Sequence, residues 1–258
     1  MFFKKFPNIE YDFEGKGETN TIKNIFRSVR ALPTFLDEFT GYSFYHVVNG
    51  ERPDIVSQRL YGSSDFYWTF FVINDFLHDG YRAWPLSQES LLDYMLKEYR
   101  GFAIETSPKV TSGPDGDFEN SLSGRFTLGE TVIGSTSNAS GTVTKKIADL
   151  SQLIVQDTTG TFTAPELIVG QTSTNSVSSN RVYKYIDAPY YYYKAGDALK
   201  RPVTSNDFIT GGVNHSQLEF VSNRAYLEDQ NDSNATIRYV DPAFINKFSK
   251  AFKDLINR

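Results

Sequence analysis

The chain has 258 residues, a formal net charge of −5 and no cysteine. The lack of cysteine excludes disulfides, thiolate metal ligands and cysteine nucleophiles, and the acidic balance provides no basic surface for nucleic acid. No segment approaches the roughly 20 apolar residues that span a bilayer, and no apolar run of a signal peptide follows the first lysines. We therefore expect a protein that is made in the cytoplasm and binds neither nucleic acid nor membrane.

Aromatic side chains are the unusual part of the composition, with 21 Phe and 16 Tyr. Permanent subunit contacts are depleted in charge and enriched in aromatic residues, so the surplus favours a protein that binds other proteins. A Phe-rich core with ordinary surface tyrosines would explain the same composition. Both interpretations stay open at this point.

The first 30 residues mix aromatic and polar positions, and we expect them to form an N-terminal arm. The Gly15-Lys16-Gly17 break indicates that the arm begins as an extended or loosely held stretch. A short helix is predicted near Thr21–Val29. The aromatics of the arm need cover from the body of the protein or from a neighbour.

The next segment predicts a compact docking module without a reactive centre. Side chains alternate across a half-buried strand at Phe44–Val48. Pro53 suits the first turn of a helix, and Gly62 suits a left-handed cap at its end. Ser64 or Asp65 then caps a second helix, Phe66–Phe76, that is apolar nearly all round and therefore buried on several sides.

A third helix is predicted over Ser87–Tyr99, with Ser87 as its cap and Gly101 after its end. Its expected apolar face consists of Leu91, Leu92, Met95 and Leu96.

The composition changes from about Glu105 to Ile186, where Thr, Ser, Gly and Asn surround short Val/Ile runs. The pattern F-T-x-x-E-x-x-x-G-x-T-S occurs at residues 126–137 and again at residues 162–173, an offset of 36. Short β-branched strands broken by Gly and Thr-Ser turns predict two similar β-hairpin units that pack into a small antiparallel barrel or sandwich. Disorder is the alternative, but the low charge and the regular apolar runs argue against it.

After the insert, the aromatic character of the first part returns. An aromatic strand is predicted at Ala188–Asp197, a helix around Glu219–Asp229 and a strand at Ala235–Val240. Asp241 and Pro242 predict the start of a last helix that continues over Ala243–Ile256. Its apolar face is expected to carry Phe244, Phe248, Phe252 and Leu255.

Catalytic motifs are weak throughout the sequence. Of the three histidines, His46, His78 and His215, only His78 has close acidic neighbours, and no ligand cluster converges on it. The acidic stretch Asp115–Asn120 lacks the ligand spacing of a calcium loop. No nucleophile elbow, phosphate-binding loop or zinc-protease motif occurs, and nothing indicates a particular carboxylate pair for glycoside hydrolysis. We therefore predict no enzyme, no cofactor and no metal.

From Tyr45 onward the chain reads Y-x-V-x-x-G-x-x-P-x-x-I/V-x-x-x-L-Y-G-x-x-x-x-x-W-x-x-x-x-x-N, which resembles a LysM fold, a glycan-binding β-α-α-β unit. Four short motifs are more specific: Arg52-Pro53, Leu60-Tyr61-Gly62, Tyr67-Trp68 and Asn74-Asp75. Together they resemble the small baseplate wedge subunit of contractile-tail, T-even-like bacteriophages, which carries a LysM-like domain. The segments Ile22–Val29, Pro189–Asp197 and Arg224–Arg238 agree with that family, so the resemblance covers about residues 1–100 and 187–258.

The resemblance implies an α+β protein: a LysM-like β-α-α-β core domain with flanking helices, plus an inserted all-β domain built from two similar units. The expected parts are the arm at 1–30, the wedge core at 31–104, the β insert at 105–186 and the C-terminal part of the core at 187–258.

It also implies a non-enzymatic virion component of the tail baseplate, made in the host cytoplasm, that joins neighbouring wedges. Its partners would be other wedge subunits, copies of itself in adjacent wedges, and sheath- or tube-proximal baseplate proteins. The alternative is a peptidoglycan-binding LysM module of a cell-wall-targeting phage protein. The residues expected to contact partners are Phe2, Phe3, Phe6, Phe70, Phe71, Phe76, Phe244, Phe248, Phe252 and Leu255.

Overall fold

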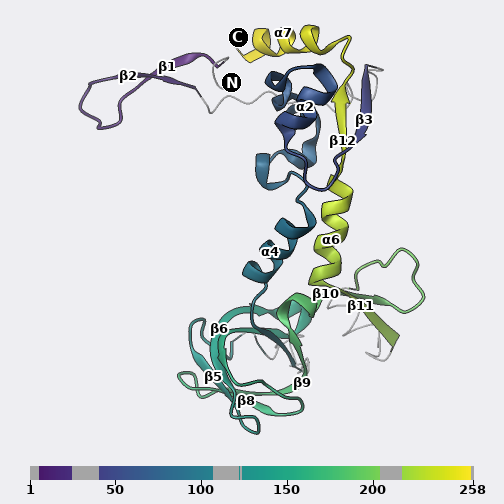
Figure 1. The fold of residues 1–258 in the computed structure, drawn as a ribbon. Coiled ribbons are helices and arrows are strands. Elements are labelled where there is room, and N and C mark those ends of the chain that lie inside the picture. The colour runs from purple at the N-terminus through teal and green to yellow at the C-terminus, as the bar shows by residue number, and fades with distance from the viewer. Residues whose placement is uncertain (1–5, 25–40, 107–121, 123, 204–216, 257–258) are drawn as a thin grey trace, which may run out of the picture. The chain divides into compact units, whose positions relative to one another are not determined.

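The computed structural model describes residues 6–24, 41–106, 122, 124–203 and 217–256 (Figure 1). They belong to two compact units. Unit 1 holds Met1–Leu91 and Asp229–Arg258, and unit 2 holds Leu92–Glu228. Helices and strands both occur, in agreement with the predicted α+β class. The domain borders predicted after residues 30, 104 and 186 stay predictions.

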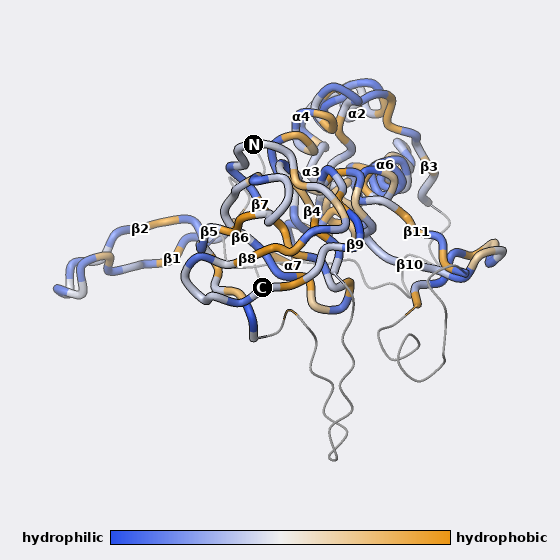
Figure 2. The backbone as a smooth tube through the Cα atoms, turned by 90° about the horizontal axis from the view of Figure 1, so that it is seen from below, coloured by the Kyte–Doolittle hydropathy of each residue, from blue (hydrophilic) through white to orange (hydrophobic). Residues whose placement is uncertain are grey.

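Unit 1 begins with a hairpin of β1 (Asn8–Tyr11) and β2 (Asn20–Lys23), which pair antiparallel. The Asp12 carboxylate holds the turn by accepting the N–H groups of Gly15 at 2.7 Å and Gly17 at 2.6 Å, and the turn is largely hydrophilic in Figure 2. The helix predicted near Thr21–Val29 is therefore wrong for residues 21–23, because these residues pair with β1 as the strand β2. Residues 25–29 lie outside the described part of the chain.

The core of unit 1 combines β3 (Tyr42–His46), α2 (Pro53–Tyr61), α3 (Trp68–Ile73) and β12 (Thr236–Val240). The strand β12 pairs antiparallel with β3, so the two strands of this strand-helix-helix-strand arrangement come from distant parts of the sequence. The strand predicted at Ala235–Val240 is confirmed, and β3 lies two residues earlier than predicted. The buried centre consists of Val47, Val56, Phe70, Leu77, Trp84 and Ile237.

The first helix of unit 1 begins and ends where the sequence predicts. Pro53 occupies its first turn, and Gly62 follows its end with a φ of 69°. The Gly62 N–H donates to the carbonyl of Gln58 at 3.0 Å, which satisfies an acceptor that the helix end would otherwise leave open.

The second helix is shorter than predicted. Instead of one helix over Phe66–Phe76, the chain forms a 3-10 turn η2 (Ser64–Phe66), the helix α3 and a second 3-10 turn η3 (Asp75–Leu77). Ser63, one residue before the predicted caps, accepts the N–H of Asp65 at 3.2 Å. Trp68, Thr69, Phe70 and Ile73 are buried, whereas Phe76 is 40% exposed.

Asn74 explains why the helix stops. Its side chain is buried, accepts the Arg238 N–H at 2.8 Å and donates to the Arg238 carbonyl at 2.9 Å. It also donates to the carbonyl of Phe70 at 2.8 Å. The amide thus takes the place of a strand on the edge of β12 that β3 does not use, and the backbone at Asn74 is extended.

The third predicted helix is confirmed as α4 (Gln88–Glu98), which follows a 3-10 turn η4 (Gly80–Arg82). Ser87 caps it by accepting the Ser90 N–H at 3.1 Å. Its predicted apolar face is only partly buried: Met95 is buried and Leu91 half-buried, whereas Leu92 and Leu96 are exposed.

The C-terminal elements shift slightly from their predicted places. β10 (Pro189–Lys194) pairs with β11 (Leu218–Ser222), and α6 (Asn223–Asn234) follows. The helix predicted around Glu219–Asp229 therefore begins later, because residues 218–222 pair as a strand. The last helix, α7 (Ile245–Ile256), follows Asp241, whose carboxylate accepts the Ala243 N–H at 3.0 Å.

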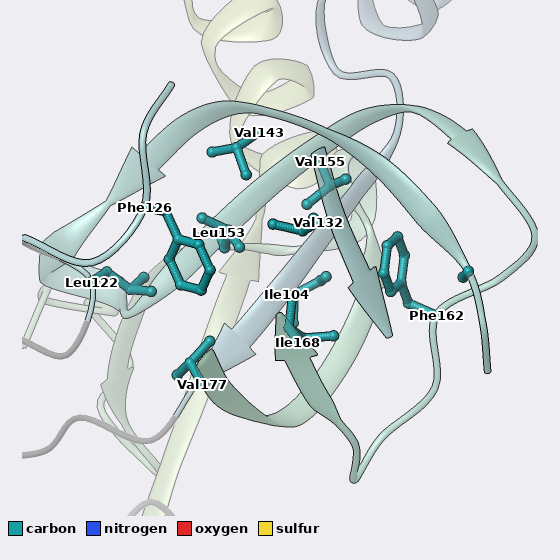
Figure 3. Packing of buried hydrophobic residues seen from close by; sticks show 11 residues of the cluster. Ile104, Leu122, Phe126, Val132, Val143, Leu153, Val155, Phe162, Ile168 and Val177 are labelled. Atoms are coloured by element: carbon teal, nitrogen blue, oxygen red, sulfur yellow. The ribbon is translucent and has the colours of Figure 1, made fainter. Parts of the chain in front are cut away.

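Unit 2 contains a closed antiparallel barrel in the strand order β4-β7-β6-β5-β8-β9. The sequence predicts a small barrel or a sandwich for the insert, and the structure forms the barrel. Its core is shown in Figure 3, where Phe126, Phe162 and aliphatic side chains from several strands point toward one another. Closure leaves no sheet edge exposed. The strands are β4 (Phe102–Thr106), β5 (Thr131–Gly134), β6 (Ser140–Ile147), β7 (Gln152–Thr159), β8 (Leu167–Gly170) and β9 (Ser176–Lys184), with 3-10 turns η5 (Ala148–Leu150) and η6 (Tyr185–Asp187).

The repeated sequence pattern occupies equivalent places in the barrel. β5 and β8 pair so that Ile133 lies opposite Val169, its equivalent 36 residues on. The same register places Val132 opposite Gly170 and Gly134 opposite Ile168, so the pairing is symmetric about that central pair. Construction from two similar units stays a prediction, and this register supports it.

A buried glutamate of each repeat binds the turn of the other repeat. The Glu130 carboxylate accepts the N–H of Thr127 at 2.6 Å, within its own repeat. It also accepts the N–H groups of Thr172 at 3.2 Å and Ser173 at 3.0 Å, and the Ser173 hydroxyl at 3.0 Å. Glu166 accepts the equivalent donors from Thr163, Thr136 and Ser137 at 2.7–3.2 Å. The glutamate, threonine and serine positions of the repeated pattern are therefore linked by hydrogen bonds, and each glutamate binds the Thr-Ser pair of the other repeat.

Candidate partner interface

The sequence placed a partner interface on ten aromatic and aliphatic residues, and their exposure differs widely. Phe2 and Phe3 lie outside the described residues. Phe6, Phe70 and Phe252 are buried, and Phe71 and Phe248 are half-buried. Phe76, Phe244 and Leu255 are 40%, 44% and 52% exposed. Among the described residues of this set, these three are the most exposed.

The buried aromatics fill the core of unit 1. Phe6, Trp68, Phe252 and Ile256 form one buried cluster. The rings of Trp68 and Phe252 lie 4.4 Å apart, centre to centre, and Phe248 stacks on Trp68 at 6.3 Å. For these residues the Phe-rich core, the second interpretation of the composition, accounts for the aromatic side chains.

The helix α7 buries one side and leaves a neighbouring apolar side exposed. At about 100° per residue, Ile245, Phe252 and Ile256 share one side, and all three are buried. Phe244 and Leu255 fall beside that side and remain exposed. We call Phe244, Ala251 and Leu255 the α7 shoulder. Periodicity in the sequence predicted an apolar face that contains Phe244 and Leu255, whereas the buried side of the helix is centred on Ile245, Phe252 and Ile256.

A second exposed group lies on the outer side of β3. The Arg238 guanidinium carbon lies 5.3 Å from the Tyr42 ring centre and 5.8 Å from that of Phe44, which is 62% exposed. The two rings meet edge to face at 5.9 Å. We call Tyr42, Phe44 and Arg238 the β3 face. Sequence reasoning missed Phe44, although strand alternation that turns Tyr45 and Val47 inward predicts it.

The opposite side of β3 carries a polar contact that joins the strand to α2. The Tyr45 hydroxyl donates to the Glu51 carboxylate at 2.7 Å and accepts from Arg59 at 2.6 Å. Burial and the Glu51 carboxylate raise the pKa of Tyr45, and Glu51 raises the pKa of Arg59. Trp84 Nε1 donates to the Glu51 carbonyl at 2.7 Å. Each group has a structural partner, so this contact holds the fold together.

The described acidic side chains and histidines do not form a metal site. No group of three or more His, Asp or Glu side chains among them comes together as a metal site. His78 is exposed and pairs with Asp79 at 3.0 Å, and His46 lies 3.4 Å from the Thr236 hydroxyl. His215 and Asp115–Asn120 lie outside the described part. A membrane-spanning helix is also absent from the residues that the structure describes.

Comparison with known proteins finds a match to the N-terminal part of the chain. Residues 1–107 match a family described as base plate wedge protein 53. This stretch is therefore related to baseplate wedge subunits, and the resemblance found from the sequence motifs is confirmed for it. The LysM-like detail and the agreement at residues 187–258 stay predictions.

A particular relative is the baseplate wedge protein gp53 of Enterobacteria phage T4. It is 28% identical over 105 residues, which cover 39% of this chain and 52% of the relative. The match thus spans about half the length of that relative. Residues 1–107, the stretch that matches the family, include β3, α2, α3 and α4, whereas β12, α7 and most of the barrel lie beyond residue 107.

Proposed function

We propose that this protein is a non-enzymatic structural component of a phage tail baseplate, where it joins neighbouring wedges and wedge proteins. The observation that carries the proposal is the match of residues 1–107 to base plate wedge proteins. Its partners are other wedge subunits, copies of itself in adjacent wedges and sheath- or tube-proximal baseplate proteins. It acts in the virion, after synthesis in the host cytoplasm.

The surfaces that suit this function are the α7 shoulder and Phe76. Phe244 and Leu255 expose large apolar side chains next to a helix side that is already fixed by packing. A rigid apolar surface loses little conformational entropy when a partner covers it. Phe2 and Phe3 stay part of the proposed interface as residues of the N-terminal arm. Phe6, Phe70, Phe71, Phe248 and Phe252 contribute by holding the helices that present the surface.

Co-expression with candidate wedge proteins tests the assembly role. The full chain should co-purify with at least one of them, and the double variant Phe244→Asp with Leu255→Asp should lose that complex while its thermal unfolding stays unchanged. Asn246→Asp is the matched control, because it adds the same charge per position at an exposed site on another side of α7. Equal loss in the control variant, or no loss in the double variant, contradicts the assignment of the shoulder.

The alternative function is that of a peptidoglycan-binding LysM module, and a pull-down on insoluble peptidoglycan distinguishes it from the assembly role. A glycan-binding module should bind saturably as the free chain, and it needs no wedge protein. The β3-α2-α3-β12 arrangement supports a LysM-like geometry, but that geometry alone does not imply a function. Saturable glycan binding together with no complex with any wedge protein would contradict the assembly role.

A further inference from the structure

One edge of β3 carries free backbone groups. In the described residues β3 pairs only with β12, and Val47 N–H and Asp241 N–H bond across that pair to Ala235 and Gly41. Because bonded positions alternate in an antiparallel pair, the N–H and C=O groups of Tyr42, Phe44 and His46 point away from β12. An open strand edge of this kind is a template for another strand.

The positively charged side chain of Arg238 lies close to that edge. The side chains of Tyr42 and Phe44 lie on the same side of the sheet as Arg238, which stands across from Phe44 in register. The guanidinium lies over both rings, and no carboxylate among the described residues pairs with it. An arginine stacked on aromatic rings keeps its N–H donors available for a carboxylate. The edge therefore suits an incoming strand with an acidic side chain on that side.

The N-terminal hairpin offers such a strand. Asn24 N–H bonds to Pro7 across the hairpin, so the backbone groups of Asn8 and Glu10 point outward from β1. Glu10 is exposed and shares its side of the hairpin with Thr21, whose hydroxyl donates to it at 2.6 Å. A two-stranded hairpin is marginally stable alone in water, so it gains from pairing with a further strand.

We propose that the β1 edge of one copy pairs antiparallel with the β3 edge of a second copy, with Glu10 opposite Phe44 and its carboxylate on Arg238. Residues directly opposite in such a pair share one side of the sheet. The register therefore places Ile9 and Tyr11 of the hairpin on the other side, with Tyr45, which packs into the core of unit 1. The acidic residue meets the cation, and the apolar residues meet the apolar side.

Charge favours β1 over the other strand of the hairpin. The outward backbone positions of β2 are Thr21 and Lys23, and Lys23 would bring a like charge toward Arg238. The inference rests on the proposed function, since it names a second copy as one partner in the assembly. It adds a specific contact between copies, and no other wedge protein is needed for it.

The absence of cysteine from the chain gives a direct test. The proposed register places Asn8 opposite His46, at a Cα separation of about 5.5 Å, which a disulfide can bridge. Under mild oxidation, a mixture of an Asn8→Cys chain with a His46→Cys chain should form the mixed disulfide dimer. Both variants leave Glu10, Phe44 and Arg238 intact.

Asn20→Cys is the matched control, because it makes the same substitution on the other strand of the hairpin. Asn20 pairs with Tyr11, which the proposed register sets opposite Ser43. The Cα atoms of Asn20 and His46 are then two strand spacings and three residues apart, more than about 10 Å and beyond the reach of a disulfide. Mixing Asn20→Cys with His46→Cys should therefore give only the background level of dimer. Equal dimer from both mixtures, or none from the Asn8 mixture, overturns the proposal.

Charge reversal tests the ion pair separately. Glu10→Lys in the Asn8→Cys chain should lower the yield of mixed dimer about five-fold, the effect of losing an exposed ion pair at the upper end of its range. Arg238→Glu in the His46→Cys chain should restore the yield. Failure of the reversed pair to restore dimer contradicts the role of Arg238.

Two further results separate the possible failures. The first uses a single chain that carries both Asn8→Cys and His46→Cys. If this chain forms only an internal disulfide and the mixture of single variants gives no dimer, the hairpin docks on its own β3 and the proposed contact between copies is wrong. If no cross-link forms while the wild-type chain still co-purifies with wedge proteins, this inference fails and the proposed function stands. Loss of that co-purification counts against the proposed function, whatever the cross-linking result.

Discussion

Glu130 and Glu166 each bind the Thr-Ser turn that belongs to the other one's repeat. Both carboxylates are buried, at 4% and 5% exposure. Burial alone would raise the pKa of Glu130, but N–H donors from Ser173 and Thr127 outweigh it, and the pKa lies below its ordinary value of 4.5. The Glu166 pKa is lowered by equivalent donors against the same opposing burial. These reciprocal hydrogen bonds explain why the Glu and Thr-Ser positions are the same in both copies of the repeat.

Replacing either glutamate with glutamine should destabilise the barrel. The glutamine amide puts an NH₂ donor against N–H groups that need an acceptor, which costs about 1–3 kcal/mol per variant. Urea unfolding of Glu130→Gln and Glu166→Gln measures the loss. Glu228→Gln, at an exposed position of unit 2, is the control and should change stability by less than about 0.5 kcal/mol. Wild-type stability in both glutamine variants would mean that the carboxylates are dispensable.

The same two groups predict how barrel stability depends on pH. Their folded pKa values are depressed, so each carboxylate stabilises the fold above the ordinary value of 4.5. That contribution is lost as pH falls through the lowered values, because the unfolded chain then binds protons more readily. Unfolding midpoints measured from pH 7 down to about pH 3 should decline more steeply below 4.5 in the wild type than in the double glutamine variant. Parallel curves for the two proteins would contradict this account.

The glycine of the repeat should resist substitution for steric reasons. A Cβ at Gly134 would lie 2.5 Å from the Glu166 carboxylate, and one at Gly170 would lie 2.7 Å from that of Glu130. Gly134→Ala should therefore cost about 1–3 kcal/mol in urea unfolding, the usual range for overpacking. Gly124→Ala is the control, since a Cβ there meets open space. A neutral Gly134→Ala would show that the glutamate has room to move.

Local signals made several elements predictable. Pro53 and Gly62 mark the ends of α2 through their own backbone preferences. The fixed φ of proline suits the first helical turn, and glycine adopts the positive φ that follows the last turn. The 36-residue repeat predicted a small antiparallel barrel or sandwich, because β5 pairs with its neighbour β6, β8 pairs with its neighbour β9, and β5 pairs with β8, the equivalent strand of the other repeat. The repeat does not indicate the pairing of β4 with β7 and β9, which closes the barrel.

Two wrong predictions depend on pairing and packing partners elsewhere in the chain. Residues 21–23 form a strand because β1 pairs with them, and the sequence around Thr21 does not contain that information. Phe252 belongs to the core because Trp68, 184 positions earlier, packs on it. Periodicity correctly found an apolar stripe on α7, but it does not distinguish the side that contacts Trp68 from the side that faces solvent.

Substitutions on α7 should separate its two apolar sides. Phe252→Asp places a charge in the buried cluster with Trp68 and should unfold unit 1 or cost more than about 3 kcal/mol. Leu255→Asp, at a residue 52% exposed, should change stability by less than about 0.5 kcal/mol. Thermal unfolding followed by near-ultraviolet circular dichroism distinguishes them. If both variants remain folded, α7 packs less tightly than its burial indicates.

The amide of Asn74 should be indispensable for the fold of unit 1. Asn74→Asp keeps the acceptor for the Arg238 N–H but sets a carboxylate against the carbonyls of Phe70 and Arg238, which now receive N–H donors at 2.8 and 2.9 Å. Because the site is buried, we expect a loss of about 2–4 kcal/mol, and Asn74→Ala should cost a similar amount by removing the partners of the Arg238 N–H and the Arg238 carbonyl. Asn246→Asp, exposed on α7, is the control for adding a charge. Chemical denaturation measures all three variants, and a stable Asn74→Asp protein would mean that the edge of β12 does not depend on this amide.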